Sequence, residues 1–235
     1  MAVAAMPPLS TPIEGYWARW EQRSSGWKAA VEFLHPFGRD HAEAFAPLAP
    51  LFAALRALPG VEVVPVEFLH ATWLHIGFLS ADDVMWSQVD TFYVGAAPRL
   101  RRVEPRAVRL GGITLTDDGR VTLGVEDGGL FREARRQAAL GVPRAEQALD
   151  ADPAMSPAGD TYSLTIDLAY LDGSASAESV SRAIEPYRDT RLSEVTPTHL
   201  MLARRSALPE RHFDSLDIVA EVPMLGAQHR GGYHN

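Results

Sequence analysis

The segment that most constrains how this chain can fold runs from Phe68 to Leu79. It is rich in apolar and aromatic side chains, which is typical of a β-strand. Side chains alternate between the two faces of a strand, so we expect His70 and Thr72 on one face and His75 on the other. An imidazole beside a hydroxyl at a strand end can transfer a proton and hold an oxygen of an anion. This segment therefore predicts both a strand and a candidate site.

Signals for strands and helices alternate along the rest of the chain. An apolar stripe predicts a helix from Pro50 to Leu58, and Asp117-Asp118-Gly119 predicts a hairpin turn, which needs positive φ. Further helices are predicted near residues 16–30, 81–93, 130–140 and 178–187, and strands at 29–34, 61–68, 108–116, 120–125, 162–170, 195–204 and 216–222. We expect the segment 61–68 to pair with the segment 70–79, or to form one long bent strand with it. This order predicts an α+β fold with mostly antiparallel strands and helices on one face of each sheet.

The length of 235 residues suits one domain or two closely packed lobes. We expect residues 1–15 to form a loose leader, residues 16–225 a single two-lobed domain and residues 226–235 a flexible tail. The apolar N-terminus lacks a basic region, and no uncharged run approaches the ~20 residues that span a bilayer. We therefore expect a cytoplasmic protein that does not bind membranes, and a monomer.

The composition narrows the class of ligand. The formal net charge is −8, whereas proteins that bind long nucleic acid through its phosphates normally carry a basic surplus. This acidity indicates a small-molecule or short nucleotide substrate. The chain has no cysteine, which excludes disulfides, thiolate catalysis and cysteine-ligated zinc. His35 and His41 lack acidic support at ligand spacing, and there is no Gly-rich phosphate loop, so we expect neither a metal nor a cofactor.

The order of elements and the segment Leu69-His70-Ala71-Thr72 together resemble the 2H phosphoesterase superfamily, particularly its bacterial 2′-5′ RNA ligase-like group. The resemblance covers residues 31 to 225. It implies two pseudo-symmetric α+β lobes, each an antiparallel sheet with helices on one face, around a central cleft. In that family each lobe contributes one His-x-Thr strand, with one His as general base, the other as general acid, and hydroxyls that hold phosphate oxygens. The resemblance assigns an acid or base role to His70 and a phosphate-oxygen donor role to Thr72.

The second motif of the family has two possible counterparts in this chain. In the first alignment, the run from Ser163 to Tyr170 takes its place, so that Thr165 replaces the second His and Asp167 replaces the hydroxyl. In the second alignment, His199 keeps the imidazole, but Met201 replaces the hydroxyl and little chain remains for the second lobe. We favour the first alignment, in which His199 belongs to a later strand.

This degenerate motif changes the expected chemistry. Threonine has no pKa near neutrality, and Asp167 would need a raised pKa to transfer a proton and would repel phosphate as a carboxylate. A third residue, such as His199, His75 or Tyr170, could then replace the missing acid. The catalytic candidates are His70, Thr72, Asp167 and His199. The substrate-binding candidates are Thr165, Tyr170 and Arg204, the last because an arginine suits phosphate.

Three functions remain open at this point. The leading hypothesis is a divergent 2′-5′ RNA ligase-like or cyclic phosphodiesterase-like enzyme that acts on a small cyclic phosphate or an oligonucleotide end. The second is an enzyme whose cleft has been turned to non-phosphate acid–base chemistry on a small molecule, with His70 and Asp167 as its residues. The third is a catalytically inactive ligand-binding protein.

Overall fold

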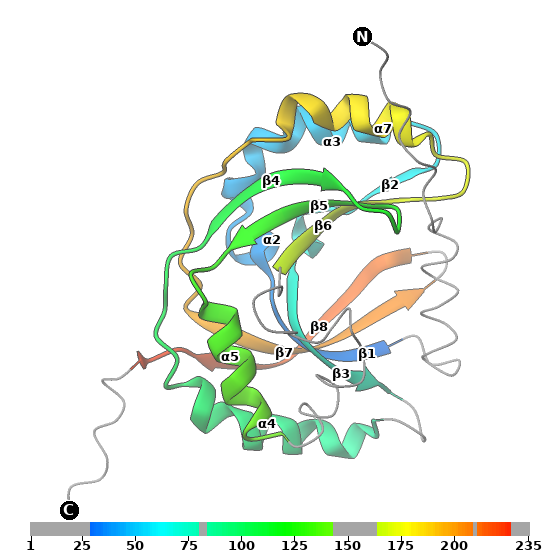
Figure 1. Cartoon of the computed structure of the whole chain (residues 1–235). Helices are drawn as coiled ribbons and strands as arrows, with labels where there is room; N and C mark the ends of the chain where they lie inside the picture. Colours follow the sequence, from blue (N-terminus) through cyan, green and yellow to red (C-terminus); the bar gives the residue numbers. More distant parts are fainter. Residues whose placement is uncertain (1–28, 80–83, 143–163, 209–210, 227–235) are drawn as a thin grey trace, which may run out of the picture.

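The computed structural model describes residues 29–79, 84–142, 164–208 and 211–226 (Figure 1). The expected leader, the helix expected before residue 29 and most of the expected tail lie outside the described residues. Within the described ranges the chain forms two four-stranded antiparallel sheets with helices. The predicted α+β class is confirmed.

The first sheet, sheet A, joins segments that lie far apart in the sequence. Its strand order is β3-β1-β7-β8. The strands are β1 (Ala29–His35), β3 (Ala71–Phe78), β7 (His199–Leu208) and β8 (Arg211–Pro223). Strand β1 therefore lies between β3 and β7 and pairs with both.

The second sheet, sheet B, has the order β2-β6-β5-β4. Its strands are β2 (Val61–Val63), β4 (Arg109–Leu115), β5 (Arg120–Glu126) and β6 (Leu164–Leu171). The predicted hairpin between β4 and β5 is confirmed, and Gly119 has the positive φ of 83° that its turn requires.

The segment from Val61 onward differs from the prediction, because it connects the two sheets. Strand β2 ends at Val63 in sheet B, and the 3₁₀ helix η2 (Val66–Phe68) then leads to β3 in sheet A. The predicted pairing of the segments 61–68 and 70–79 is therefore wrong. Pro65 has a φ of −59° and no N–H for a sheet ladder, which ends the extended segment before η2 begins.

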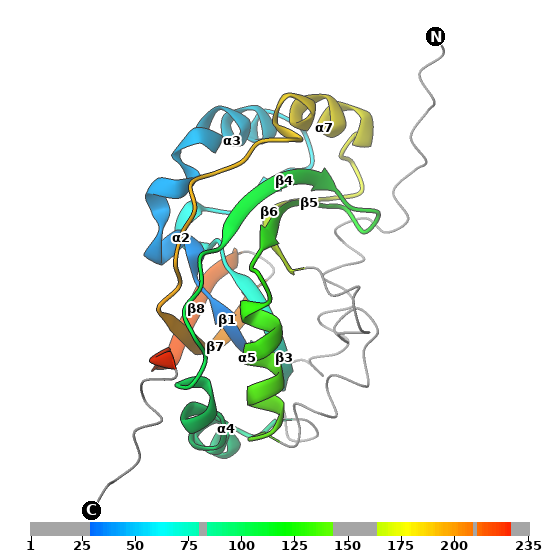
Figure 2. The same ribbon diagram turned by 60° about the vertical axis from the view of Figure 1, so that its left-hand side comes forward.

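The helices lie on the outer side of each sheet (Figures 1 and 2). Helices α3 (Ala49–Arg56) and α7 (Ala177–Ile184) cover sheet B, whereas α4 (Trp86–Leu100) and α5 (Leu130–Ala139) cover sheet A. The short elements are α2 (Phe37–Asp40), η1 (Ala42–Leu48) and η4 (Glu185–Tyr187). The helix predicted at 81–93 starts later, where the Gln88 side chain accepts a hydrogen bond from the Met85 N–H. No described helix is long and apolar enough to cross a membrane.

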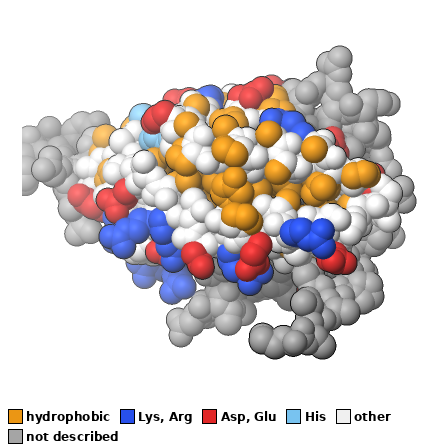
Figure 3. Space-filling model, turned by 90° about the horizontal axis from the view of Figure 1, so that it is seen from above, with side chains coloured by type: hydrophobic (Ala, Val, Ile, Leu, Met, Phe, Trp, Pro, Cys, Tyr) orange, Lys and Arg blue, Asp and Glu red, His pale blue; other side chains and the backbone are white. Residues whose placement is uncertain are grey.

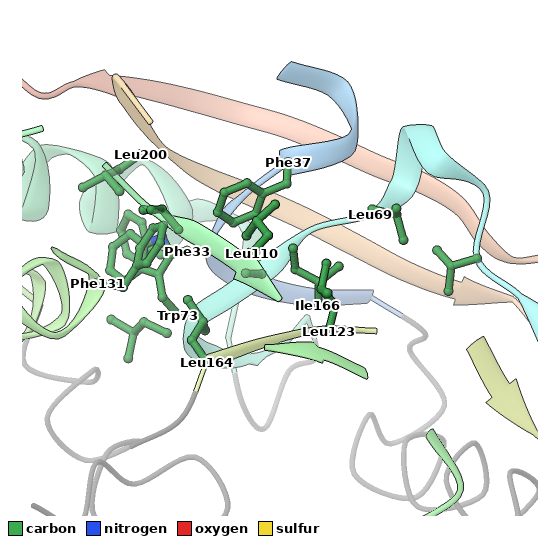
Figure 4. Packing of buried hydrophobic residues seen from close by; sticks show 14 of the residues in the cluster. Phe33, Phe37, Leu69, Trp73, Leu110, Leu123, Phe131, Leu164, Ile166 and Leu200 are labelled. Carbon is green, nitrogen blue, oxygen red and sulfur yellow. The ribbon is translucent and has the colours of Figure 1, made fainter. Parts of the chain in front are cut away.

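An aromatic stack holds sheet A against α5 (Figure 4). Phe33 of β1 and Trp73 of β3 stack with ring centroids 5.1 Å apart, and Trp73 lies 6.5 Å from Phe131 of α5. All three side chains are fully buried. Aromatic rings bury large apolar areas, so this stack fixes which face of β1 and β3 points to the helices. The polar residues of both strands must then point to the other face.

The outer face of sheet B's helices is apolar but built from small side chains (Figure 3). The exposed residues of η1 and α3 include a run of alanines and prolines: Ala46, Pro47, Ala49, Pro50, Ala53 and Ala54. An exposed ion pair between Arg182 and Glu178 lies on α7. The described part of α3 and α7 exposes no large aromatic side chain of the kind that anchors a protein interface.

Helices α4 and α5 approach closely at two glycines. A Cβ atom on Gly95 of α4 would overlap the carbonyl oxygen of Gly141, which follows α5. Glycine costs a helix about 1 kcal/mol relative to alanine. Its presence in the middle of α4 is therefore explained by this contact rather than by helix formation.

We expect Gly95→Ala to lower the free energy of unfolding by about 1–3 kcal/mol, because the new methyl group forces the two helices apart. Thr91→Ala, at an exposed position of the same helix, is the control and is expected to be neutral or slightly stabilising. Urea unfolding of the three proteins measures both effects. A Gly95→Ala variant that is more stable than the wild type would contradict the close approach of α4 to Gly141.

His35, at the end of β1, is buried in its neutral form. The side chain is 1% exposed, its Nδ1 donates to the carbonyl of His199 at 3.2 Å, and its ring meets the edge of Phe37. Burial lowers the pKa of His35 to about 4, helped by the charges of His41 and Arg39 and opposed by Asp40 and by the bond to His199. The folded protein therefore binds a proton at this ring only in acid.

This lowered pKa predicts a loss of stability in acid. Between pH 6.5 and about 4 the unfolded chain protonates His35 while the folded protein does not, so stability falls as the pH falls through that window. The contribution at pH 4 is on the order of 3 kcal/mol. Urea unfolding of the wild type and of His35→Phe at pH 7 and pH 4 measures it. The variant should lose less stability than the wild type, and an equal loss would show that His35 is not responsible.

Candidate functional site

Strand β3 carries an irregularity that decides which side chains share a face. Between Thr72 and Leu74 it has one residue more than β1, so that Trp73 bulges toward the helices. As a result Thr72 and His75 both reach Glu32 of β1. The prediction that His75 points to the opposite face is wrong, because it assumed regular alternation along the strand.

His70, just before β3, has a fixed ring orientation. Its Nδ1 donates to the carbonyl oxygen of Phe68 at 2.6 Å, which leaves Nε2 as the nitrogen that can exchange a proton. Burial lowers the pKa of His70, and the positive charge of Arg205 lowers it further. The bond to Phe68 and the charges of Glu32 and Asp167 raise it again without restoring the usual value. His70 is therefore neutral near pH 7, with a basic nitrogen available.

A buried carboxylate organises this face of sheet A. We call Glu32, Thr72, His75 and Arg205 the Glu32 cluster. Glu32 is 1% exposed, and Arg205 donates to both of its oxygens, at 2.9 and 3.0 Å. Thr72 Oγ1 donates at 2.9 Å, and His75 Nδ1 lies at 3.2 Å. Burial alone would raise the pKa of Glu32, but Arg205 and His75 hold it well below its usual value, so the carboxylate is ionised.

A second carboxylate lies on β6 of sheet B. We call Asp118, Arg120, Asp167 and Tyr170 the Asp167 cluster. Arg120 Nη1 donates to Asp167 at 3.1 Å, and the Tyr170 hydroxyl donates to the other oxygen at 2.8 Å. Arg120 also donates from its Nε to both oxygens of Asp118, at 3.1 and 2.9 Å. The arginine is thus shared between two carboxylates.

The two strands that carry these clusters have the same local pattern. Strand β3 has one extra residue directly after Thr72, and β6 has one directly after Asp167. Each extra residue returns the side chain three positions on to the same face, so that His75 joins Thr72 and Tyr170 joins Asp167.

Five predicted site residues gather where the two sheets meet. Strands β3 and β6 contact each other although they belong to different sheets. The charges of both Glu32 and Asp167 act on His70, so both clusters lie near its ring. Thr165 is half-buried on β6, on the same face as Asp167 by strand alternation. The group is His70, Thr72, Thr165, Asp167 and Tyr170.

The structure does not bring the other two predicted residues to this group. His199 begins β7, which β1 separates from β3, so its backbone is on the order of 10 Å from β3. Its ring shares a hydrogen bond with the Thr198 hydroxyl at 2.8 Å. Arg204 lies over the ring of Trp86 at 5.5 Å and pairs with Asp217, on the helix-covered face of sheet A.

Sequence reasoning missed three charged residues of the site. The arginine at the site is Arg205, because neighbouring side chains on β7 point to opposite faces. Arg120 is the corresponding arginine of sheet B. The sequence does contain a signal for Glu32, because it is the one acidic residue in the strand segment Ala-Ala-Val-Glu-Phe-Leu-His. A charge inside such an apolar strand needs a partner. Among the described residues, no group of three or more His, Asp or Glu side chains could hold a metal.

Comparison with known proteins identifies the fold. No family model and no curated protein matches the sequence. A protein of Thermus thermophilus matches with a TM-score of 0.61 at 17% identity, over 84% of this chain and 99% of its own. Escherichia coli LigT complexed with NADP⁺ matches with a TM-score of 0.55 at 14% identity, over 84% and 98%. A conserved protein of unknown function from Agrobacterium tumefaciens matches with a TM-score of 0.56 at 12% identity, over 90% of this chain and 93% of its own.

These matches define the class of structure. The chain has the two-lobed α+β fold of LigT, so the resemblance seen in the sequence is confirmed at the level of the fold. The likeness shows the fold, and the chemistry of the site must be argued from its own residues.

We expect Glu32→Gln to lower the free energy of unfolding by about 3–5 kcal/mol, because it leaves the half-buried charge of Arg205 unbalanced. The double variant Glu32→Leu with Arg205→Met removes both charges and is expected to recover most of that loss. Glu178→Gln, which breaks the exposed pair with Arg182, should cost less than about 1 kcal/mol. Urea unfolding compares the variants. Equal losses of unfolding free energy in the single variants at Glu32 and Glu178 would show that the buried pair stabilises the fold no more than an exposed pair does.

Proposed function

We propose that the protein is an RNA ligase-like phosphoesterase with one catalytic histidine, acting on a small cyclic phosphate or on an oligonucleotide end. The observation that carries this proposal is the state of His70. Its Nδ1 is held by a backbone carbonyl, and its lowered pKa keeps Nε2 unprotonated near neutral pH, so that this nitrogen can accept a proton. The fold shared with LigT supports the same reading.

The shared pattern of β3 and β6 supports the alignment on which the proposal rests. Because the extra residue follows Thr72 in one strand and Asp167 in the other, these two positions correspond. Thr165 then corresponds to His70. The second imidazole of the family is replaced by a hydroxyl, and the second hydroxyl by a carboxylate.

The proposed reaction is the opening of a cyclic phosphate by water. His70 Nε2 takes a proton from water, the water oxygen bonds to phosphorus, and one ring P–O bond breaks. The leaving oxygen takes a proton from solvent, because the single hydrogen of the Tyr170 hydroxyl is directed at Asp167. The proton gained by His70 returns to solvent, which restores the base.

The charges of the site suit a cyclic ester. Arg205 is paired with Glu32, and Arg120 with Asp118 and Asp167, so each arginine is balanced by at least one carboxylate. A cyclic phosphodiester carries a single negative charge, whereas a phosphate monoester carries up to two at neutral pH. A site with this balance is better suited to the singly charged ester than to the dianion.

A second candidate function is proton transfer on a small molecule that carries no phosphate. It is favoured by the carboxylates of Glu32 and Asp167, whose charges both act on His70 and would repel an anion. In that case His70 is the base, and Asp167 with Tyr170 binds the ligand.

We expect the wild type to hydrolyse 2′,3′-cyclic nucleotides and His70→Gln to lower kcat by at least about 100-fold, because the general base is lost. His41→Gln is the matched control, since it removes a half-buried imidazole outside the site. Tyr170→Phe removes a hydroxyl that donates to Asp167 and should lower kcat less than His70→Gln does. The rate should fall in acid only below the usual histidine range, because the pKa of His70 is lowered.

The outcomes separate the candidates. Absence of turnover by the wild type contradicts the phosphoesterase proposal and leaves the second candidate. Turnover that survives in His70→Gln removes His70 from the mechanism and contradicts both.

A further inference from the structure

We infer that Thr72 serves as a hydrogen-bond acceptor for the ligand and that Glu32 makes it one, so that this site binds a phosphate ester with a free hydroxyl next to the phosphate. This inference deepens the proposed function and rests on it for the phosphate. It assigns Thr72 a role opposite to that of the family threonine, which the resemblance describes as a donor to phosphate oxygens.

The first step is a count of hydrogens around Glu32. An ionised carboxylate has no hydrogen to give, so the proton of the 2.9 Å contact must come from Thr72 Oγ1. A threonine hydroxyl carries a single hydrogen. Once that hydrogen is directed at Glu32, the hydroxyl presents only lone pairs to anything else that approaches it.

The second step is that Glu32 stays ionised. Both of its oxygens accept from Arg205, and the side chain is 1% exposed, so water does not compete for these bonds. Although burial opposes the charge, Arg205 and His75 hold the pKa of Glu32 well below its usual value. The direction of the Thr72 hydrogen bond is therefore constant over the neutral pH range.

The third step concerns what can bind to such a hydroxyl. A phosphate oxygen is an acceptor and would meet the lone pairs of Thr72, which is unfavourable. A hydroxyl of the ligand donates to it instead. Opening a cyclic phosphate of two neighbouring hydroxyls produces such a group, because the leaving oxygen becomes a hydroxyl beside the new monoester. Thr72 is half-buried on the same face as His70, where the opened ring would lie.

A site that accepts a hydrogen bond discriminates against ligands without the hydroxyl, because its polar atom is then left unpaired. The test uses two product-like probes, adenosine 3′-monophosphate and its 2′-deoxy analogue, together with inorganic phosphate. Binding is measured by NMR titration of the wild type, Thr72→Val and Thr72→Ser. Thermal unfolding of the variants checks that each is folded.

We expect the wild type to bind the ribonucleotide about tenfold more tightly than the deoxynucleotide. Thr72→Val should remove this preference and leave the affinity for inorganic phosphate unchanged, because the lost hydroxyl did not touch phosphate. Thr72→Ser keeps the hydroxyl beside Glu32 and should retain the preference.

Two results would overturn the inference. One is a loss of phosphate affinity in Thr72→Val, which would make Thr72 a donor to phosphate. The other is that the wild type binds both nucleotides equally or binds neither. The proposed function fails separately: if cyclic nucleotides are not hydrolysed but the ribonucleotide preference exists and vanishes in Thr72→Val, the hydrolysis proposal falls and the role of Thr72 stands.

Discussion

The buried ion pair between Glu32 and Arg205 is the interaction on which the rest of the site depends. It links β1 and β7 at the face of sheet A that the helices leave uncovered, and the same carboxylate holds Thr72 and His75 of β3. A charge at 1% exposure is tolerated only when it is paired and hydrogen-bonded, so the three strands must keep their register for the pair to survive. Stability and site geometry are therefore set by one cluster.

The fold could be predicted from the sequence where local signals agree with the final packing. The hairpin between β4 and β5 and the helix α3 were predicted correctly, because turn chemistry and periodicity are properties of short segments. The placement of β2 and β3 in different sheets was not predicted, because the packing between distant segments decides to which sheet a strand belongs. Pro65 indicated a bend, but it did not indicate that the chain passes from sheet B to sheet A there.

The site could be predicted only in part, for a related reason. His70 and Thr72 lie on one strand, so their spacing shows in the sequence, whereas Arg205 and Glu32 meet across strands that are remote in the chain. Bulges add a second difficulty, because one extra residue reverses the faces of the residues after it, and in β3 this reversal lasts until a second extra residue at Ile76. His75 was assigned to the wrong face for this reason.

One arginine couples the two halves of the proposed chemistry. Arg205 keeps Glu32 ionised, which fixes the direction of the Thr72 hydrogen bond, and its charge also lowers the pKa of His70. The carboxylate that Arg205 stabilises acts on His70 in the opposite sense. The basicity of His70 and the hydrogen-bond direction of Thr72 therefore depend on the same pair of side chains. We therefore expect a change at either member of this pair to alter the proposed proton transfer by His70 and the proposed ligand recognition by Thr72 together.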